Sequence, residues 1–207
     1  MRSLPERLSA SAVADKGITF ISGDDATHVP YDQLHGEALA MAAALQGRGV
    51  GVGAHVALLG PTTRELVTAI RAIWMAGATL VVLPLPMRLA SIEAFVDQTR
   101  TRINHADVSL VLVDADLAPF IEATPEDPPF VLLGELSGDA DAYEPVDVGP
   151  DDLGVLQFTS GSTADPKGVM LPHETISANL DAITQAAELA DDDVMVSWLP
   201  LYHDMGL

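Results

Sequence analysis

Apolar residues along this chain occur either in short continuous runs or at helical spacing. Runs rich in apolar residues at Val56–Leu59, Thr79–Leu83 and Ser109–Val113 are bounded by turn-forming residues and predict buried strands. Between them, Arg64–Ala76 and Ser91–Ala106 have apolar residues at helical spacing and predict helices. Strands that alternate with helices are typical of a mostly parallel sheet. The pattern therefore predicts an α/β fold with helices flanking the sheet.

The chain divides into three portions by composition. Residues 1–123 carry the alternating strands and helices, and a further helix is expected over Tyr31–Leu45. Residues 124–150 are rich in Pro, Gly, Asp and Glu, and we expect them to form a surface connection. Residues 151–207 carry a loop rich in glycine and hydroxyl groups, followed by a helix predicted over Glu174–Leu189.

Charge is unevenly distributed over a chain whose formal net charge is −20. Residues 1–102 hold nine basic and nine acidic side chains, whereas 103–207 hold one basic and twenty-one acidic. Such a field repels nucleic-acid phosphates and anionic lipid, so neither is an expected partner. The chain has no cysteine, no secretory signal pattern, and no apolar run near the ~20 residues of a membrane span. A cytoplasmic globular domain is therefore expected.

The stretch Thr159–Gly168 reads Thr-Ser-Gly-Ser-Thr-Ala-Asp-Pro-Lys-Gly and lies between two β-forming segments, Leu153–Phe158 and Val169–Leu171. Lys167 is the only lysine or arginine after Arg102. Hydroxyls, backbone N–H groups, glycines that admit an anion and one cation make a candidate phosphate site: Thr159, Ser160, Gly161, Ser162, Thr163, Lys167 and Gly168. A polar hairpin that binds nothing is the alternative for this composition.

The order of residues in this loop resembles the phosphate-binding loop of the adenylate-forming superfamily. That superfamily includes acyl-CoA synthetases, fatty acyl-AMP ligases and the adenylation domains of peptide synthetases. Its usual form, T-S-G-[ST]-T-G-x-P-K-G, is matched here at every position except Ala164. The loop is not a Walker A motif, because Pro166 precedes the lysine and Gly168 follows it. The resemblance implies ATP and Mg²⁺ as cofactors, with Lys167 contacting the β- and γ-phosphates.

A second segment, Val196–Leu207, resembles the next motif of the same superfamily in the form common among fatty acyl-AMP ligases. Val194–Leu199 is predicted to be a buried strand that Pro200 ends, so that the following loop lies at a strand end, where clefts form. The resemblance implies that His203 lies beside the acyl carboxylate and is the candidate catalytic residue. A histidine in isolation is more often structural. The acidic run Asp191–Asp193 is expected to be a solvated loop, not a metal site.

The two motifs together imply an incomplete N-terminal domain of an adenylate-forming ligase. Such an enzyme converts a fatty acid and ATP to acyl-AMP and pyrophosphate, with an acyl carrier protein or coenzyme A as acceptor. The motifs favour the carrier protein. A fatty acid–CoA ligase or a peptide-synthetase adenylation domain is the alternative within the superfamily. A non-catalytic nucleotide-binding module and an acidic interaction domain are alternatives from other classes.

The chain ends at Leu207, directly after the second motif, whereas members of the superfamily are much longer. We therefore expect an N-terminal fragment that is inactive alone. By resemblance, the glutamate that assists Mg²⁺, the aspartate that holds the ribose and the lid with the catalytic lysine lie beyond it.

Overall fold

A six-stranded sheet in the order β6-β5-β3-β4-β7-β8 forms the centre of the computed structural model, which describes residues 2–85, 91–121, 123–158, 167–203 and 205–207. Its strands are β3 (His55–Leu59), β4 (Thr79–Val82), β5 (Leu110–Val113), β6 (Phe130–Leu132), β7 (Leu153–Phe158) and β8 (Gly168–Pro172). Neighbouring strands are parallel except β7 and β8, which are antiparallel. A separate antiparallel hairpin consists of β1 (Gly17–Ser22) and β2 (Asp25–Pro30).

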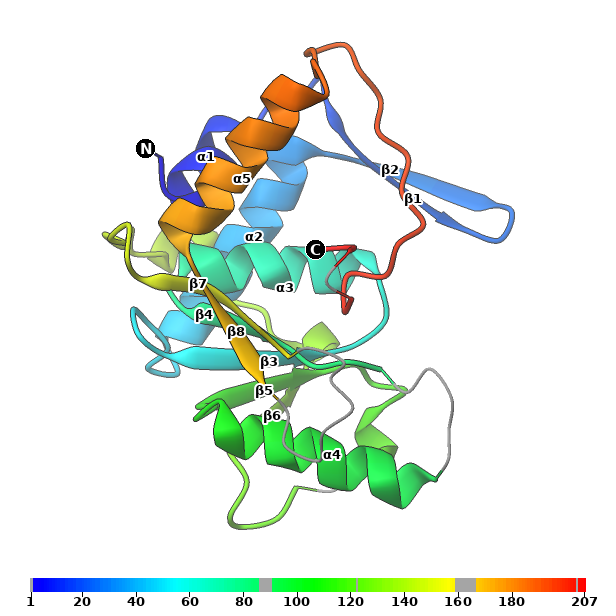
Figure 1. Cartoon of the computed structure of the whole chain (residues 1–207), viewed down its shortest axis with the longest axis vertical. Helices are drawn as coiled ribbons and strands as arrows, with labels where there is room; N and C mark the ends of the chain where they lie inside the picture. The colour runs from blue at the N-terminus through cyan, green and yellow to red at the C-terminus, as the bar shows by residue number, and fades with distance from the viewer. Residues whose placement is uncertain (1, 86–90, 122, 159–166, 204) are drawn as a thin grey trace.

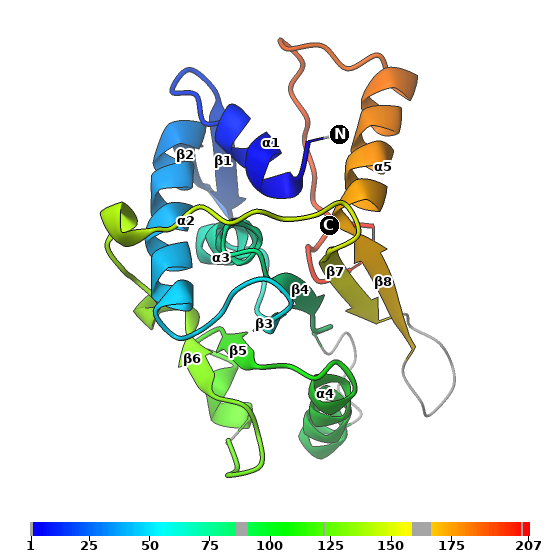
Figure 2. The same ribbon diagram turned by 90° about the vertical axis from the view of Figure 1, so that its left-hand side faces the viewer.

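Helices cover both faces of the six-stranded sheet (Figures 1 and 2). They are α1 (Leu4–Ala10), α2 (Tyr31–Gln46), α3 (Arg64–Met75), α4 (Ile92–His105) and α5 (His173–Ala186), with 3-10 turns η1 (Ala118–Phe120), η2 (Leu133–Glu135) and η3 (Ala140–Ala142). Val56 and Leu58 of β3 pack with α2 and α3, whereas Ala57 and Leu59 pack with α4 on the other face. Because both faces are covered, the central strands read as nearly continuous apolar runs, such as Val56–Leu59 in β3.

Helix α3 packs its apolar face against the sheet, and local signals define both of its ends. The Thr63 hydroxyl accepts the Leu66 backbone N–H at 3.2 Å at the start, and Gly77, with φ of +77°, follows its end. The helix also carries a buried cation, Arg71, which is 7% exposed. Its Nε and Nη2 have no hydrogen-bond partner among the described residues, and burial lowers the pKa of the guanidinium.

The α/β fold predicted from the sequence is confirmed. The three predicted strands correspond to β3, β4 and β5, and the predicted helices correspond to α2, α3, α4 and α5, with ends that differ by a few residues. The β1–β2 hairpin was not predicted. Its signal is the turn at Gly23, whose φ is +61°. No helix in the described part of the chain has the length and apolar character needed to cross a membrane.

Two expectations about segments differ from the structure. The portion 124–150 is more than a surface connection, because it contributes β6 to the sheet and buries Leu133 and Leu136. The prediction of a buried strand at Val194–Leu199 was wrong: this segment has no regular structure, and Val194 and Trp198 are 87% and 86% exposed. The physical reason is that no described strand pairs with it, and a strand needs a partner for its backbone N–H and C=O groups.

Candidate functional site

The carboxyl ends of β3, β4 and β7 meet at one edge of the sheet because these strands are parallel. The loop Gly60–Thr63 leaves this edge after β3, and the candidate phosphate loop leaves it after Phe158 of β7. In open α/β sheets, ligands bind at this edge. The topology therefore brings the first motif to the side of the sheet where ligand sites form.

β7 and β8 hold the two ends of the candidate phosphate loop together. Phe158 lies opposite Gly168 in the antiparallel ladder, and Lys167, which is exposed, directly precedes β8. Gly168 is also needed for packing, since a Cβ there would lie 3.0 Å from Leu156 Cδ2 and 3.6 Å from Phe158 Cε1. The candidate residues Thr159, Ser160, Gly161, Ser162 and Thr163 lie outside the described residues.

The second motif forms a tight turn that is tethered to the same edge of the sheet. The backbone N–H of Leu201 donates to the Thr62 hydroxyl at 3.0 Å, and Thr62 belongs to the loop that follows β3. Within the turn, His203 N donates to the Pro200 carbonyl at 3.1 Å, and Gly206 N donates to the His203 carbonyl at 2.9 Å. The second motif and the two ends of the candidate phosphate loop, Phe158 and Gly168, therefore lie at the carboxyl edge.

His203 is exposed in this turn, and its ring takes part in the local hydrogen bonding. Its Nδ1 accepts the backbone N–H of Met205 at 3.3 Å. The turn itself depends on Gly206, where a Cβ would lie 2.1 Å from the Pro200 carbonyl oxygen. Thr62 and Gly206 are site-supporting residues that the sequence reasoning missed, since their contacts are visible only in three dimensions.

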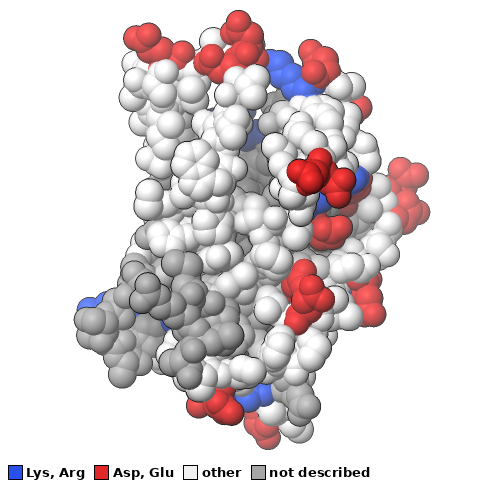
Figure 3. All heavy atoms as spheres, turned by 90° about the vertical axis from the view of Figure 1, so that its right-hand side faces the viewer, with Lys and Arg blue, Asp and Glu red and all other residues white. Residues whose placement is uncertain are grey.

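The part of the chain that carries Lys167 is acidic, since residues 103–207 hold one basic and twenty-one acidic side chains. Acidic side chains are scattered over the face drawn in Figure 3, and basic ones are few. The acidic run Asp191–Asp193 is exposed, and Asp193 Oδ2 accepts the backbone N–H of Ala190 at 2.7 Å, which is the behaviour of a turn. In the described part of the chain, no group of three or more His, Asp or Glu residues is arranged to hold a metal ion. A polyanion at this edge therefore depends on local donors.

One buried histidine follows β8 directly. His173 is 1% exposed, and neither ring nitrogen has a hydrogen-bond partner among the described residues. Burial lowers the pKa of its imidazole, against the opposing effect of the Asp152 carboxylate. His173 lines a pocket of about 400 Å³ together with the first residues of α1 and the segment before β7. The sequence reasoning assigned no role to this residue.

Comparison with known proteins identifies the family. The model of the AMP-binding enzyme family matches residues 8–207. A protein of Mycobacterium tuberculosis described as a ligase is 34% identical over 189 residues, which are 87% of this chain and 34% of that protein. A protein of Caulobacter vibrioides described as an acyl-CoA synthetase is 34% identical over 211 residues, which are 99% of this chain and 37% of that protein.

A solved ligand-bound structure shows the same architecture. The fatty acyl-adenylate ligase of Legionella pneumophila, in complex with acyl adenylate and pyrophosphate, superposes with a TM-score of 0.87 at 29% identity. The match covers 99% of this chain and 36% of that structure, so the chain spans about a third of the length of the proteins it matches. The resemblance inferred from the two motifs is confirmed: the chain belongs to the AMP-binding enzyme family of adenylate-forming ligases.

Proposed function

We propose that the full-length ligase, meaning a protein that contains this chain and extends over the length of its relatives, activates a fatty acid with ATP. A carboxylate oxygen of the acid attacks the α-phosphorus, and an O–P bond forms. The bond from that phosphorus to the bridging oxygen breaks, and its electron pair leaves with pyrophosphate. Acyl-AMP and pyrophosphate are the products. The observation that supports this proposal is that the second motif and the two ends of the candidate phosphate loop lie at the carboxyl edge of the sheet.

Lys167 stabilises the charge that moves onto the leaving pyrophosphate. It is the only lysine or arginine after Arg102, and it directly precedes β8, next to the loop whose N–H and hydroxyl groups complete the phosphate site. A fixed cation at the place where charge develops lowers the barrier more than the same cation in water does. Mg²⁺, when bound with the nucleotide, supplies further charge neutralisation at the phosphates.

His203 and the turn around it orient the fatty acid. The turn is closed by its own hydrogen bonds and tied to Thr62, so that the imidazole is held at the edge where the acid must approach the α-phosphorus. Holding the two reactants in line is the second contribution the site makes, because a carboxylate is a weak nucleophile. The proposed role of His203 is therefore to contact the acyl carboxylate.

ATP–pyrophosphate exchange with lauric acid tests the proposal in the full-length ligase. We expect exchange in the wild type, and Lys167→Ala should lower kcat/KM for ATP on the order of ten- to a thousandfold, the scale of one lost charged contact. Arg48→Ala is the matched control. It removes the same charge at the end of α2, near the amino edge of the sheet, and should leave exchange unchanged. Unchanged kinetics in Lys167→Ala would show that the loop is only a turn.

The acceptor of the acyl group is proposed to be a carrier protein. The support is the likeness of both motifs to fatty acyl-AMP ligases and the structural match to one such enzyme. The sequence similarity to a protein described as an acyl-CoA synthetase supports coenzyme A as the second candidate. Parallel incubations of full-length enzyme, ATP and lauric acid with each acceptor decide between them. Rapid formation of lauroyl-CoA would exclude the acyl-AMP ligase assignment while leaving adenylation intact.

The 207-residue chain assayed by itself is proposed to lack exchange activity, because it spans about a third of the length of its relatives. Exchange above background with the purified chain would contradict this.

A further inference from the structure

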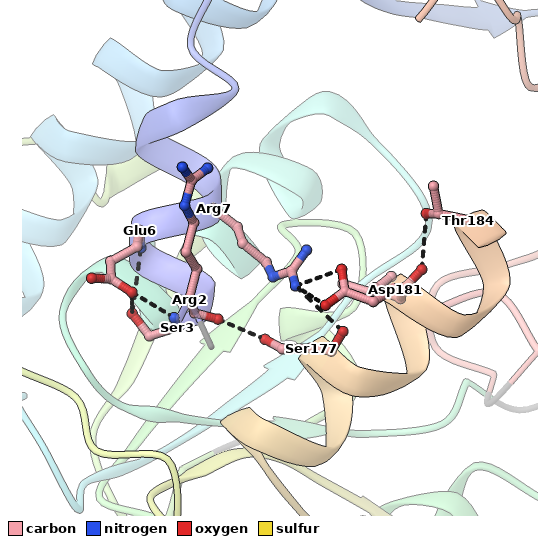
Figure 4. A network of polar contacts seen from close by, with 8 residues as sticks. Arg2, Ser3, Glu6, Arg7, Ser177, Asp181 and Thr184 are labelled. Carbon is pink, nitrogen blue, oxygen red and sulfur yellow. Dashed lines mark hydrogen bonds and ion pairs between the residues drawn. The ribbon is translucent and has the colours of Figure 1, made fainter. Parts of the chain in front are cut away.

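The N-terminal segment, residues 2–10, lies against α5, the helix that follows the candidate phosphate loop and β8 (Figure 4). Its helix α1 is organised by local contacts. Glu6 Oε2 accepts the backbone N–H of Ser3 at 2.7 Å in a capping box, and Pro5 lies in the first turn. The helix is therefore a defined body and not a loose terminus.

Polar contacts join α1 to the middle of α5. Arg7 Nη2 donates to both carboxylate oxygens of Asp181 at 2.7 Å and approaches the Ser177 carbonyl at 3.5 Å. In return, the Ser177 hydroxyl donates to the Arg2 carbonyl at 2.9 Å (Figure 4). Ser177 is 0% exposed, so this hydroxyl needs its partner. Each side of the junction both donates and accepts a hydrogen bond, so the contacts restrain the position of α5 relative to α1.

Close packing joins the same two helices to β7. Leu4 of α1 is 4% exposed and lies beside Gly154 of β7, where a Cβ would be 3.3 Å from Leu4 Cδ1 and 2.9 Å from Ile176 Cδ1 of α5. There is no space at this junction for even one more methyl group. Any displacement of α1 is therefore transmitted to both α5 and β7.

The connection from this junction to Lys167 is short and continuous. α5 begins at His173, directly after β8 ends at Pro172, and Lys167 directly precedes β8. The only α5 side chains buried by the described residues are His173 and Ser177. A helix held by so few buried groups depends on each of its contacts, and the N-terminal segment supplies those of Ser177 and Asp181.

We propose that Arg7 is a positioning residue for Lys167. By holding α5, the N-terminal segment fixes β8 and sets where the Lys167 ammonium stands relative to the phosphates of ATP. Arg7 itself contacts no substrate. The kinetic part of this inference rests on the proposed function, whereas the structural part does not.

Hydrogen exchange on the 207-residue chain tests the structural part. Arg7→Met keeps the aliphatic length and removes the contacts to Asp181, and amide exchange over residues 168–186 should accelerate about threefold to tenfold. Ser177→Ala should act in the same direction, and Arg7→Lys should restore part of the protection. Glu37→Gln, which breaks the α2–α3 ion pair with Arg64, is the matched control and should leave 168–186 unchanged. Unaltered exchange in Arg7→Met overturns the proposal.

Steady-state kinetics of the full-length ligase test the consequence for the site. Arg7→Met should lower kcat/KM for ATP about threefold to tenfold, with KM for the fatty acid unchanged, because the displaced lysine contacts the phosphates of ATP and stabilises the leaving pyrophosphate. A fall in kcat with both KM values intact, matched by an equal loss of folded protein in circular dichroism, would reduce Arg7 to a purely structural residue. A wild type without exchange activity refutes the proposed function instead, and the hydrogen-exchange result then decides whether Arg7 holds β8.

Discussion

Gly154 is the position where one added methyl group tests the junction of α1, α5 and β7. Replacement by alanine puts a Cβ 2.9 Å from Ile176 Cδ1, 3.3 Å from Leu4 Cδ1 and 3.6 Å from His173 Cδ2. The strand cannot move away easily, because the Gly154 carbonyl accepts Trp74 Nε1–H at 2.8 Å. The side chain of Ile176 must therefore rotate, and Leu4 must yield by a few tenths of an ångström.

The expected cost follows from these contacts. Overpacking costs about 1–3 kcal/mol, and Ile176 is only half-buried, so its end atom can move. The lower backbone entropy of alanine in the unfolded chain returns about 0.4–1 kcal/mol. We expect Gly154→Ala to lower the free energy of unfolding by about 1–2 kcal/mol. Gly36→Ala, on α2 with no atom within 4 Å of its Cβ, is the control and should be neutral or stabilising.

Urea denaturation followed by circular dichroism measures these differences on the 207-residue chain. Ile176→Val removes the Cδ1 atom that the new methyl group meets. The free energy of unfolding of the double variant should therefore be about 1 kcal/mol higher than the sum of the two single effects predicts. If Gly154→Ala lowers the free energy of unfolding equally with and without Ile176→Val, the clash lies elsewhere and the reasoning is refuted.

Three further predictions follow from side chains described above. Arg71→Met should raise the free energy of unfolding by about 1 kcal/mol or more, because it removes a buried cation whose Nε and Nη2 have no hydrogen-bond partner among the described residues; destabilisation in urea would mean that the guanidinium is paired. Burial lowers the pKa values of the His173 and His35 imidazoles below their ordinary 6.5, and the charge of Arg71 lowers that of His35 further. The folded state therefore binds fewer protons than the unfolded state. The free energy of unfolding should fall as pH decreases below about 6.5. His173→Gln should flatten this pH dependence in urea titrations, whereas replacing the exposed His28 in the same way should not. Trp198→Ser should reduce the binding of a hydrophobic dye, since Trp198 is 86% exposed beside other exposed apolar residues; a wild-type chain that binds no dye would contradict this.

The sheet and its helices were predictable because their signals are local. β3, β4 and β5 read as continuous apolar runs, since both faces of each strand are covered, and α3 carries its own capping residue at Thr63. The family motif was readable for the same reason, as its residues are contiguous. Strand order was not predicted, because the pairing of β4 with β7 joins segments separated by about seventy residues.

The segment Val194–Leu199 shows why an apolar pattern does not determine burial. Its apolar composition determines how much free energy burial would contribute. Burial also requires an apolar surface against which the segment can pack. No described strand offers one, and Val194 and Trp198 are exposed. The contacts of the candidate site have the same character. Leu201 contacts Thr62 and Arg7 contacts Asp181 across more than a hundred residues of sequence. The sequence around each residue contains no signal that predicts its partner.

β8 is the last strand on its side of the sheet, and β7 is its only partner among the described strands. Its outer row of backbone N–H and C=O groups is a template to which another strand can add, and Val169 and Met170 on it are 43% and 60% exposed. Two molecules that each carry a charge of −20 repel one another before such edges can meet. Salt shortens the range of this repulsion to about 8 Å at physiological ionic strength. Ionic strength therefore governs the solubility of the chain, and added salt should precipitate it under conditions that leave the fold intact.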